Sequence, residues 1–199
     1  MKERPILFSA PMVRAILAGT KTQTRRVVKF KPWYQIEERD DGTQWPWMYD
    51  SENDGDCWIP SPYGQPGDRL WVRETWAAPH GEDGRPPRAI QCDQMRIHYA
   101  ASEDRGGLLW RPSIHMPRWA SRITLEVTGL RVERLQDISE EDALAEGIDK
   151  NEANRTLSCI GLNVISGPVA EYSALWESIN GPDSWEFNPW VWVIQFKKL

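Results

Sequence analysis

The segment 123–132 is the feature that most constrains the fold of this chain. Apolar side chains occupy every second position from Ile123 to Val127, and polar side chains occupy the positions between them. Such alternation is typical of a β-strand with one face on a core and the other face in water. We expect this strand to bend at Gly129 and to resume through residue 132. The chain must therefore contain a sheet with a buried face.

The C-terminal segment 190–197 predicts a second strand of that sheet. Trp190, Trp192, Ile194 and Phe196 share one face at strand spacing. A long apolar strand at the edge of a sheet is a site of aggregation. We therefore expect this strand to be paired inside the sheet.

Capping residues and hydrophobic periodicity predict the other elements. Ser9 and Pro11 precede an apolar stripe that ends at Gly19, as expected for the N-cap, the first turn and the C-cap of a helix. Ser139 begins a second helix, with Asp142 at the capping-box distance. The remaining predicted elements are strands at 6–8, 22–28, 70–76 and 97–100, a helix at 168–180 and a polar loop at 149–167.

Two segments lack clear periodicity. Residues 29–66 are rich in Pro, Gly, Asp and Trp, although 34–44 has the pattern of a hairpin, and residues 78–120 are similarly irregular. The mixture of helices and strands predicts one α+β domain over 1–199 with two long irregular insertions. The first insertion is a candidate lid or specificity element, or else a structural loop held by its tryptophans.

Composition excludes several classes of protein. The chain has no run of about 18 apolar residues, which argues against a membrane span, and its first residues lack a secretory signal. Cys57, Cys92 and Cys159 form no C-x-x-C pair, and the histidines lack ligand spacing. We therefore expect a cytoplasmic protein with no metal, no cofactor and no disulfide framework. A net charge of −5 argues against binding to long duplex nucleic acid, because such binding neutralises many phosphates.

Eight residues after the first predicted helix carry most of the candidate chemistry. The stretch 19–26, GTKTQTRR, combines three cations with three hydroxyls. Its ordinary interpretation is a helix C-cap followed by a solvated basic strand. Its functional interpretation is that Lys21 acts as a base, which requires its pKa to fall from about 10.4 towards neutrality. Strand parity would turn Lys21 away from Thr24, so a shared site requires Lys21 to lie in the turn before the strand.

The same stretch resembles a known family. Gly19-x-Lys21, Thr24 and Arg26 are similar to the G-x-K-x-x-x-x-R signature of ASCH domains. Further similarities follow in order over roughly half of the chain, and they are the stretch 67–74 (GDRLWVRE), the strand 123–132, the acidic helix 139–147 and a closing C-terminal strand. This resemblance implies a PUA-like small β-barrel flanked by helices, and a link to RNA and modified-nucleoside chemistry.

Within that family, the chain resembles small amidohydrolases that remove the acyl group from N4-acetylcytidine. The resemblance implies a catalytic set of Lys21, Thr24 and Glu146, with Glu74 as the alternative carboxylate. Glu146 is also unusual by itself, because a carboxylate in the last turn of a helix opposes the helix dipole. Substrate contacts are expected from side chains that suit phosphate contacts and base stacking, although packing of arginine stems is the alternative: Arg26, Arg73, Trp76, Trp110, Arg118, Trp119 and Arg122.

We therefore predict an amidohydrolase for an N4-acylated cytosine nucleoside, with a small nucleoside or a short RNA as its partner. Two other functions stay open. One is an RNA-binding or RNA-cleaving ASCH module, and the other is a non-catalytic accessory protein of the phage or prophage type that longer ASCH proteins resemble. Salt dependence separates the first two, because RNA binding weakens steeply with salt. The acyl group, the sugar and the oligomeric state do not follow from the sequence.

Overall fold

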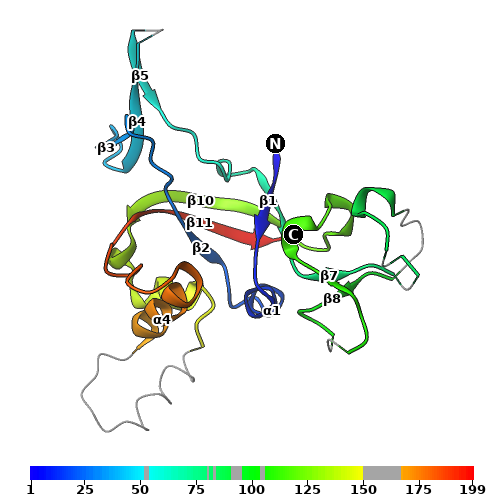
Figure 1. Ribbon diagram of the computed structural model, residues 1–199. Helices are drawn as coiled ribbons and strands as arrows, with labels where there is room; N and C mark the ends of the chain where they lie inside the picture. Colours follow the sequence, from blue (N-terminus) through cyan, green and yellow to red (C-terminus); the bar gives the residue numbers. More distant parts are fainter. Residues whose placement is uncertain (52–53, 80, 83, 91–95, 104–105, 150–166) are drawn as a thin grey trace, which may run out of the picture.

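A five-stranded mixed sheet lies at the centre of the computed structural model (Figure 1). The structure describes all residues except 52–53, 80, 83, 91–95, 104–105 and 150–166. The strand order is β1-β6-β10-β11-β2, with β1 parallel to β6 and the other neighbours antiparallel. These strands are β1 Glu3–Leu7, β2 Gln23–Val27, β6 Arg69–Arg73, β10 Thr124–Arg134 and β11 Trp190–Lys198.

The two strands predicted from alternation lie in the middle of this sheet. β10 pairs with β6 on one side and with β11 on the other, and its register shifts between Val127 and Gly129, which confirms the predicted bend. β11 is buried on both faces. Trp192 and Ile194 belong to one core cluster, whereas Val191 and Val193 belong to a second. The prediction that this strand is paired inside the sheet is confirmed.

Helices cover both faces of the sheet. α1 (Ala10–Ala18) buries Val13 and Ile16 in the first core, and it ends at Gly19, whose φ of 78° is left-handed and favours glycine. α2 (Glu140–Ala145) and α4 (Pro168–Asn180) cover the second core. Most of the predicted loop at 149–167 lies outside the described residues. Among the described helices, none is long and apolar enough to span a membrane.

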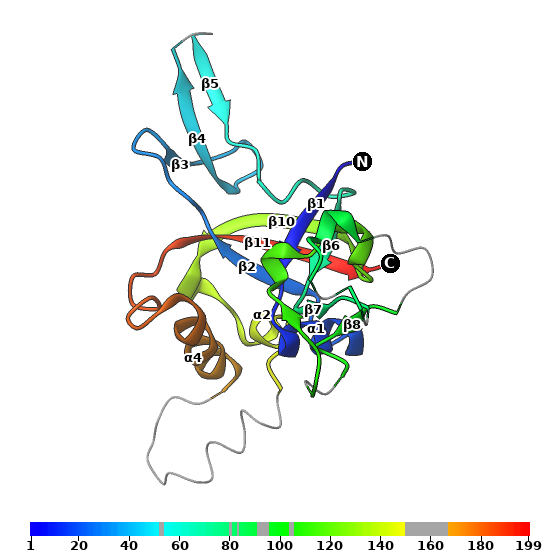
Figure 2. The ribbon, with the colours of Figure 1, turned by 45° about the vertical axis from the view of Figure 1, so that its right-hand side comes forward.

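The two insertions carry small sheets of their own. β3 (Gln35–Glu38), β4 (Gln44–Asp50) and β5 (Gly55–Trp58) form an antiparallel sheet that projects from the central sheet (Figures 1 and 2). β7 (Trp76–Ala77) pairs with β8 (His98–Tyr99) and β9 (Trp110–Arg111). Short 3-10 helices at Pro87–Ala89, Ser113–His115 and Arg118–Ala120 complete the second insertion, and another at Leu135–Asp137 precedes α2.

The structure corrects two expectations about the architecture. The first insertion is not irregular, because the predicted hairpin forms and gains a third strand through pairing of Trp47 with Trp58. The turn residues and Pro46 hide this pairing in the sequence. The central sheet is not closed into a barrel, since β1 and β2 are its opposite edges and no pairing joins them among the described residues.

Candidate functional site

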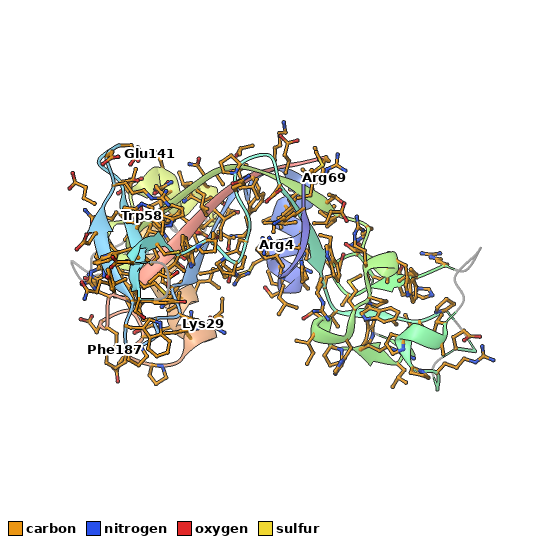
Figure 3. All side chains as sticks on the ribbon, turned by 90° about the horizontal axis from the view of Figure 1, so that it is seen from above. Arg4, Lys29, Trp58, Arg69, Glu141 and Phe187 are labelled. Carbon is orange, nitrogen blue, oxygen red and sulfur yellow. The ribbon has the colours of Figure 1, made fainter. Side chains whose placement is uncertain are left out.

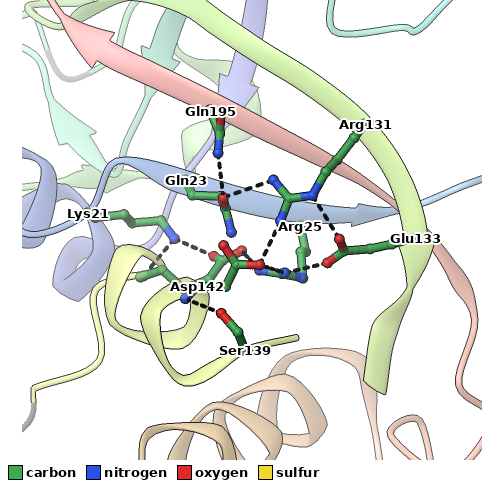
Figure 4. Close-up of polar contacts among 9 residues, drawn as sticks. Lys21, Gln23, Arg25, Arg131, Glu133, Ser139, Asp142 and Gln195 are labelled. Atoms are coloured by element: carbon green, nitrogen blue, oxygen red, sulfur yellow. Dashed lines mark hydrogen bonds and ion pairs between the residues drawn. The ribbon is translucent and has the colours of Figure 1, made fainter. Parts of the chain in front are cut away.

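Lys21 and Glu146 form a buried ion pair where β2 approaches the end of α2 (Figure 4). The Lys21 Nζ donates to Glu146 Oε2 at 2.7 Å and to the Glu146 backbone carbonyl at 2.7 Å. Lys21 is 2 % exposed and Glu146 is 4 % exposed. The backbones of these two residues also form an antiparallel bridge, and the Thr22 N–H donates to the Ala145 carbonyl at 2.9 Å. Main-chain contacts therefore position the pair.

The local chain path explains how Lys21 reaches this position. The Gly19 turn ends α1, and the Lys21 N–H donates back to the Ala15 carbonyl at 3.2 Å. β2 begins at Gln23, so Lys21 precedes the strand and does not follow its alternation. A shared site of Lys21 and Thr24 requires Lys21 to lie in the turn before the strand, and the structure meets this requirement.

Thr24 and the Glu146 member of this pair line a small cavity. The cavity has a volume of about 60 Å³ and is lined by Thr24, Arg26 and Glu146, and by the face of α4 that carries Tyr172. Its rim includes Asn180, which is exposed. A space of this size holds about two water molecules. A hydroxyl and a carboxylate therefore face a space large enough for a small chemical group.

Burial changes the acid–base behaviour of Lys21. Desolvation lowers the pKa of the Lys21 ammonium, and the nearby Arg26 and Arg25 lower it further. The Glu146 carboxylate acts in the opposite direction, and the net shift of the Lys21 pKa is downward. A lysine whose pKa is lowered is closer to acting as a base at neutral pH.

Arg25 connects the ion pair to a larger charged network (Figure 4). Its side chain is fully buried and contacts three carboxylates. Its Nη1 donates to Glu146 Oε1 at 3.3 Å, and its Nη2 donates to Asp142 Oδ2 at 2.7 Å and to Glu133. Arg131 donates to the same Asp142 at 2.6 Å and to the same Glu133 at 2.8 Å. The network therefore contains three carboxylates and, with Lys21, three cations.

The capping interactions of α2 bring Asp142 into this network. The Ser139 Oγ accepts a hydrogen bond from the Asp142 N–H at 3.1 Å, as the sequence predicts for an N-cap. Burial raises the pKa of the Asp142 carboxyl, but the hydrogen bond from Arg25 and the charge of Arg131 outweigh it, so the net pKa is below its usual range. Asp142 therefore stays ionised and holds both guanidinium groups.

Among the predicted substrate contacts, Arg26 lies at the cavity and the others do not line it. The Arg26 Nη2 donates to the Leu7 carbonyl at 2.6 Å, and its guanidinium lies over the Phe8 ring at 5.3 Å. The other predicted contacts belong to β6, to the second insertion and to the segment after it, toward the opposite end of the molecule from α4 (Figures 1 and 3). These are Arg73, Trp76, Trp110, Arg118, Trp119 and Arg122.

These distant residues make contacts of their own, away from the cavity. Trp76 has no exposed surface and packs with Met116, so its aromatic surface is used by a core and not by a substrate. Glu74, the alternative carboxylate, is 1 % exposed and accepts two hydrogen bonds from Arg122, at 2.9 and 3.0 Å. Arg118 pairs with Glu3 at 2.9 Å. The structure thus joins Glu146, and not Glu74, to Lys21.

The remaining three residues make local contacts in the same region. Arg73 donates through its Nε to the Ser113 carbonyl at 3.1 Å. Trp119 is 40 % exposed and meets Trp76 edge-on at 5.7 Å, and Trp110 is partly buried in β9. None of these three side chains lines the cavity beside Lys21.

Sequence reasoning missed three side chains of the site. Arg25 stands in the basic stretch, but nothing in the pattern shows that it contacts three carboxylates. Asp142 has an ordinary role in the first turn of α2, which conceals its second role. Tyr172 belongs to the apolar stripe of α4, and the structure places its ring 5.9 Å from the Arg25 guanidinium. Burial raises the pKa of the Tyr172 hydroxyl, which therefore stays protonated.

Comparison of the chain with protein-family models, with curated proteins and with solved structures gives no match. The similarity to ASCH domains therefore stays a prediction from short motifs. Geometry and chemistry alone define the candidate site at Lys21 and Glu146. In the described part of the chain, no group of His, Cys, Asp and Glu side chains is arranged to hold a metal ion.

Proposed function

We propose that this protein is an amidohydrolase that removes a small acyl group from an N4-acylated cytosine nucleoside, on a PUA-like ASCH fold. One observation carries the proposal: Glu146, the buried partner of Lys21, lines the same small cavity as Thr24. Hydrolysis of an amide requires an attacking oxygen, a base and an acid for the leaving amine. These three side chains supply all of them.

The proton transfers balance within the ion pair. At 2.7 Å, a proton of the Lys21 ammonium passes to Glu146, which leaves a neutral amine beside a carboxylic acid. The amine then takes the proton of the attacking oxygen, which belongs to a water held by Thr24 or to the Thr24 hydroxyl itself; in the second case, water hydrolyses the resulting acyl-threonine ester in a further step. The carboxylic acid gives its proton to N4 of cytosine as the bond to the acyl carbon breaks. With water as the attacking group, the products are a carboxylic acid and the free amine, and the ion pair is restored.

The size of the cavity supports a small acyl group. About 60 Å³ admits an acetyl group but not a whole nucleoside. The base then lies at the rim, where Arg26 and Asn180 offer hydrogen-bond donors. We therefore expect acetyl substrates to react faster than benzoyl substrates.

The order of elements supports the ASCH part of the proposal. The chain runs from strand β1 through helix α1 and its glycine cap to the basic strand β2, and the acidic helix α2 follows the long strand β10. This is the order that the motif resemblance implies. The two small sheets of the insertions would be additions of this chain to the smaller family members.

Turnover of a substrate panel tests the function. Purified protein is incubated with N4-acetylcytidine, N4-benzoylcytidine and a short acetylated RNA, and cytidine release is followed by chromatography. Lys21→Arg keeps the charge but stays protonated, so the rate should fall by about 10²-fold or more. Lys21→Met removes the amine, and its rate should fall by the same factor. Arg14→Gln is the matched control, because Arg14 is exposed on α1 and lies away from the cavity.

Two results would reject the proposal. One is the absence of hydrolysis for every member of the panel with folded wild-type protein. The other is a wild-type rate in both Lys21 variants, which would move the reaction to another site.

A further inference from the structure

A second and larger cavity lies between the projecting sheet and the N-terminal strand. It has a volume of about 640 Å³, within the usual range of ligand sites of about 300–1,000 Å³. We name it the insertion cleft and define it by six of its lining residues: Lys2, Arg4, Arg39, Trp45, Trp58 and Gln65. It shares no lining residue with the cavity beside Lys21, so the two spaces are independent.

The first insertion builds an aromatic support in this cleft. Trp47 and Trp58 are directly opposite in the ladder, and Trp45 is two residues before Trp47 on the same face. Arg39 directly follows β3, and its guanidinium lies over the Trp45 ring at 3.7 Å and over the Trp58 ring at 5.1 Å. Trp45 is itself fixed, because it meets Trp192 of the central sheet edge-on at 5.0 Å. The stack therefore holds the Arg39 cation in one place.

The cations of the cleft exceed the carboxylates that are free to pair with them. Asp41 accepts hydrogen bonds from the Thr43 N–H and hydroxyl, and Asp68 accepts from the Lys2 N–H at 2.8 Å. Within the described residues, the Nε atoms of Arg4 and Arg39 are buried without a hydrogen-bond partner. Burial lowers the pKa of Arg39, and the Asp41 charge acts in the opposite direction. The Arg4 Nη1 donates to the Pro62 carbonyl at 3.3 Å, and an anion in the cleft would accept from the other N–H groups of the two guanidinium groups.

Trp58 gives the cleft an accessible aromatic surface. It is 40 % exposed, whereas Trp45 is 7 % exposed. A large ring that stays in contact with water beside Arg39 is suited to stacking on a base, and every base offers a flat face for such stacking. The same cleft therefore combines a stacking surface with donors for a phosphate.

We propose that the insertion cleft binds a nucleotide, with its base on Trp58 and its phosphate between Arg4 and Arg39. The nucleotide is either free or one unit of a single strand, because the recognised chemistry is the same. The net charge of −5 agrees with contact to a few phosphates only. The proposal does not depend on amide hydrolysis, since it uses no residue of that site and no turnover.

Binding measurements on the whole protein test the inference. Fluorescence anisotropy follows a fluorescein-labelled pentamer of uridine, and calorimetry follows uridine monophosphate. Trp58→Ala and Arg39→Gln should each weaken binding of the pentamer by about tenfold or more. Trp33→Ala and Arg14→Gln are matched controls and should change it less than about twofold, because Trp33 is an exposed tryptophan of the same insertion and neither side chain lines the cleft.

Salt and a conservative variant sharpen the test. Two phosphate contacts to a single strand give a slope of log K against log salt of about −1.4 in the wild type, and Arg39→Gln should reduce it. Trp58→Phe keeps a ring and should keep most of the binding. If Trp58→Ala fails to fold by circular dichroism, Arg39→Gln and Trp58→Phe decide the result.

The outcomes are distinct. Binding of the pentamer but not of the monophosphate identifies a strand as the ligand, and equal binding identifies a free nucleotide; both support the proposal. Absence of binding of either probe at millimolar concentration overturns it. So does retention of wild-type affinity in Arg39→Gln, or equal weakening in the control variants.

Discussion

Replacement of Glu146 by glutamine tests the buried ion pair most directly. The position of Glu146 at the end of α2, taken alone, predicts that the replacement leaves the free energy of unfolding unchanged or slightly higher. A carboxylate at this end of a helix is disfavoured by the helix dipole by about a few tenths of a kcal/mol. The buried contacts reverse that expectation. Lys21 loses its carboxylate partner, and Arg25 loses one of three.

The structure sets the size of the effect on the free energy of unfolding. Removal of one partner from a buried ion pair costs about 3–5 kcal/mol. Glutamine keeps one acceptor oxygen, and Lys21 keeps its bond to the carbonyl of residue 146, so the lower end of this range applies. For a chain of 199 residues, about 3 kcal/mol corresponds to a fall in Tm of about 6–12 °C.

The pH dependence gives a second check, with a defined sign. Burial already lowers the pKa of Lys21, and loss of the Glu146 charge lowers it further. Between the folded and unfolded pKa values, the unfolded chain binds more protons, so stability rises with pH in that window. This pH window begins at the folded pKa of Lys21, so it extends to lower pH in the variant than in the wild type. The stability deficit of Glu146→Gln is therefore largest at low pH and shrinks as pH rises.

Thermal unfolding followed by circular dichroism at about pH 6 and about pH 9 measures both effects. Glu141→Gln is the control, because it removes the same charge from an exposed position of α2. The double variant Lys21→Met with Glu146→Leu should recover stability, since no lysine is left without a partner, and should stay inactive. An unchanged Tm in Glu146→Gln, or a deficit that grows with pH, would refute the reasoning.

Three further measurements follow from the same contacts. The value of kcat/KM should fall as pH rises through the lowered pKa of Lys21, because the ion pair then loses the proton that Glu146 passes to the leaving amine, and a flat profile would contradict this. Thr24→Ser should keep most of the activity, whereas Thr24→Ala should lose about 10²-fold in a turnover assay. Trp76→Ala should lose about 3–5 kcal/mol of stability in denaturant unfolding, and Trp119→Ala less than about 1 kcal/mol, because Trp76 alone is fully buried; similar losses would show that the two rings share one core.

Local signals in the sequence predicted much of the central fold. The glycine after α1, the serine before α2 and the alternation in β10 each act within a few residues, and each prediction is confirmed. The three-stranded sheet of the first insertion was missed beyond its hairpin. Its stability depends on the cross-strand pair of Trp47 and Trp58 and on the contact of Trp45 with Trp192, a residue far away in the sequence. Such contacts leave no periodic pattern.

The candidate site was also predicted only in part. The contact of Lys21 with Glu146 agrees with the motif resemblance, although their catalytic roles stay predictions. Trp76, Trp110 and Trp119, which we expected to stack on the substrate, do not line this cavity. The sequence could not show this, because composition does not indicate where an insertion lies relative to the sheet. The role of Arg25 could not be predicted either, since a buried arginine and a solvated one have the same sequence pattern.

The bridge between residues 21 and 146 also has a consequence for how the chain folds. The two residues are separated by 125 positions, so their contact closes a long loop and must overcome a large entropic cost before the native contacts compensate it. The helix α1 and its cap depend on local contacts and can form much earlier. During refolding, catalytic activity should therefore return later than helical circular dichroism, which makes turnover a sensitive reporter of the final folding step.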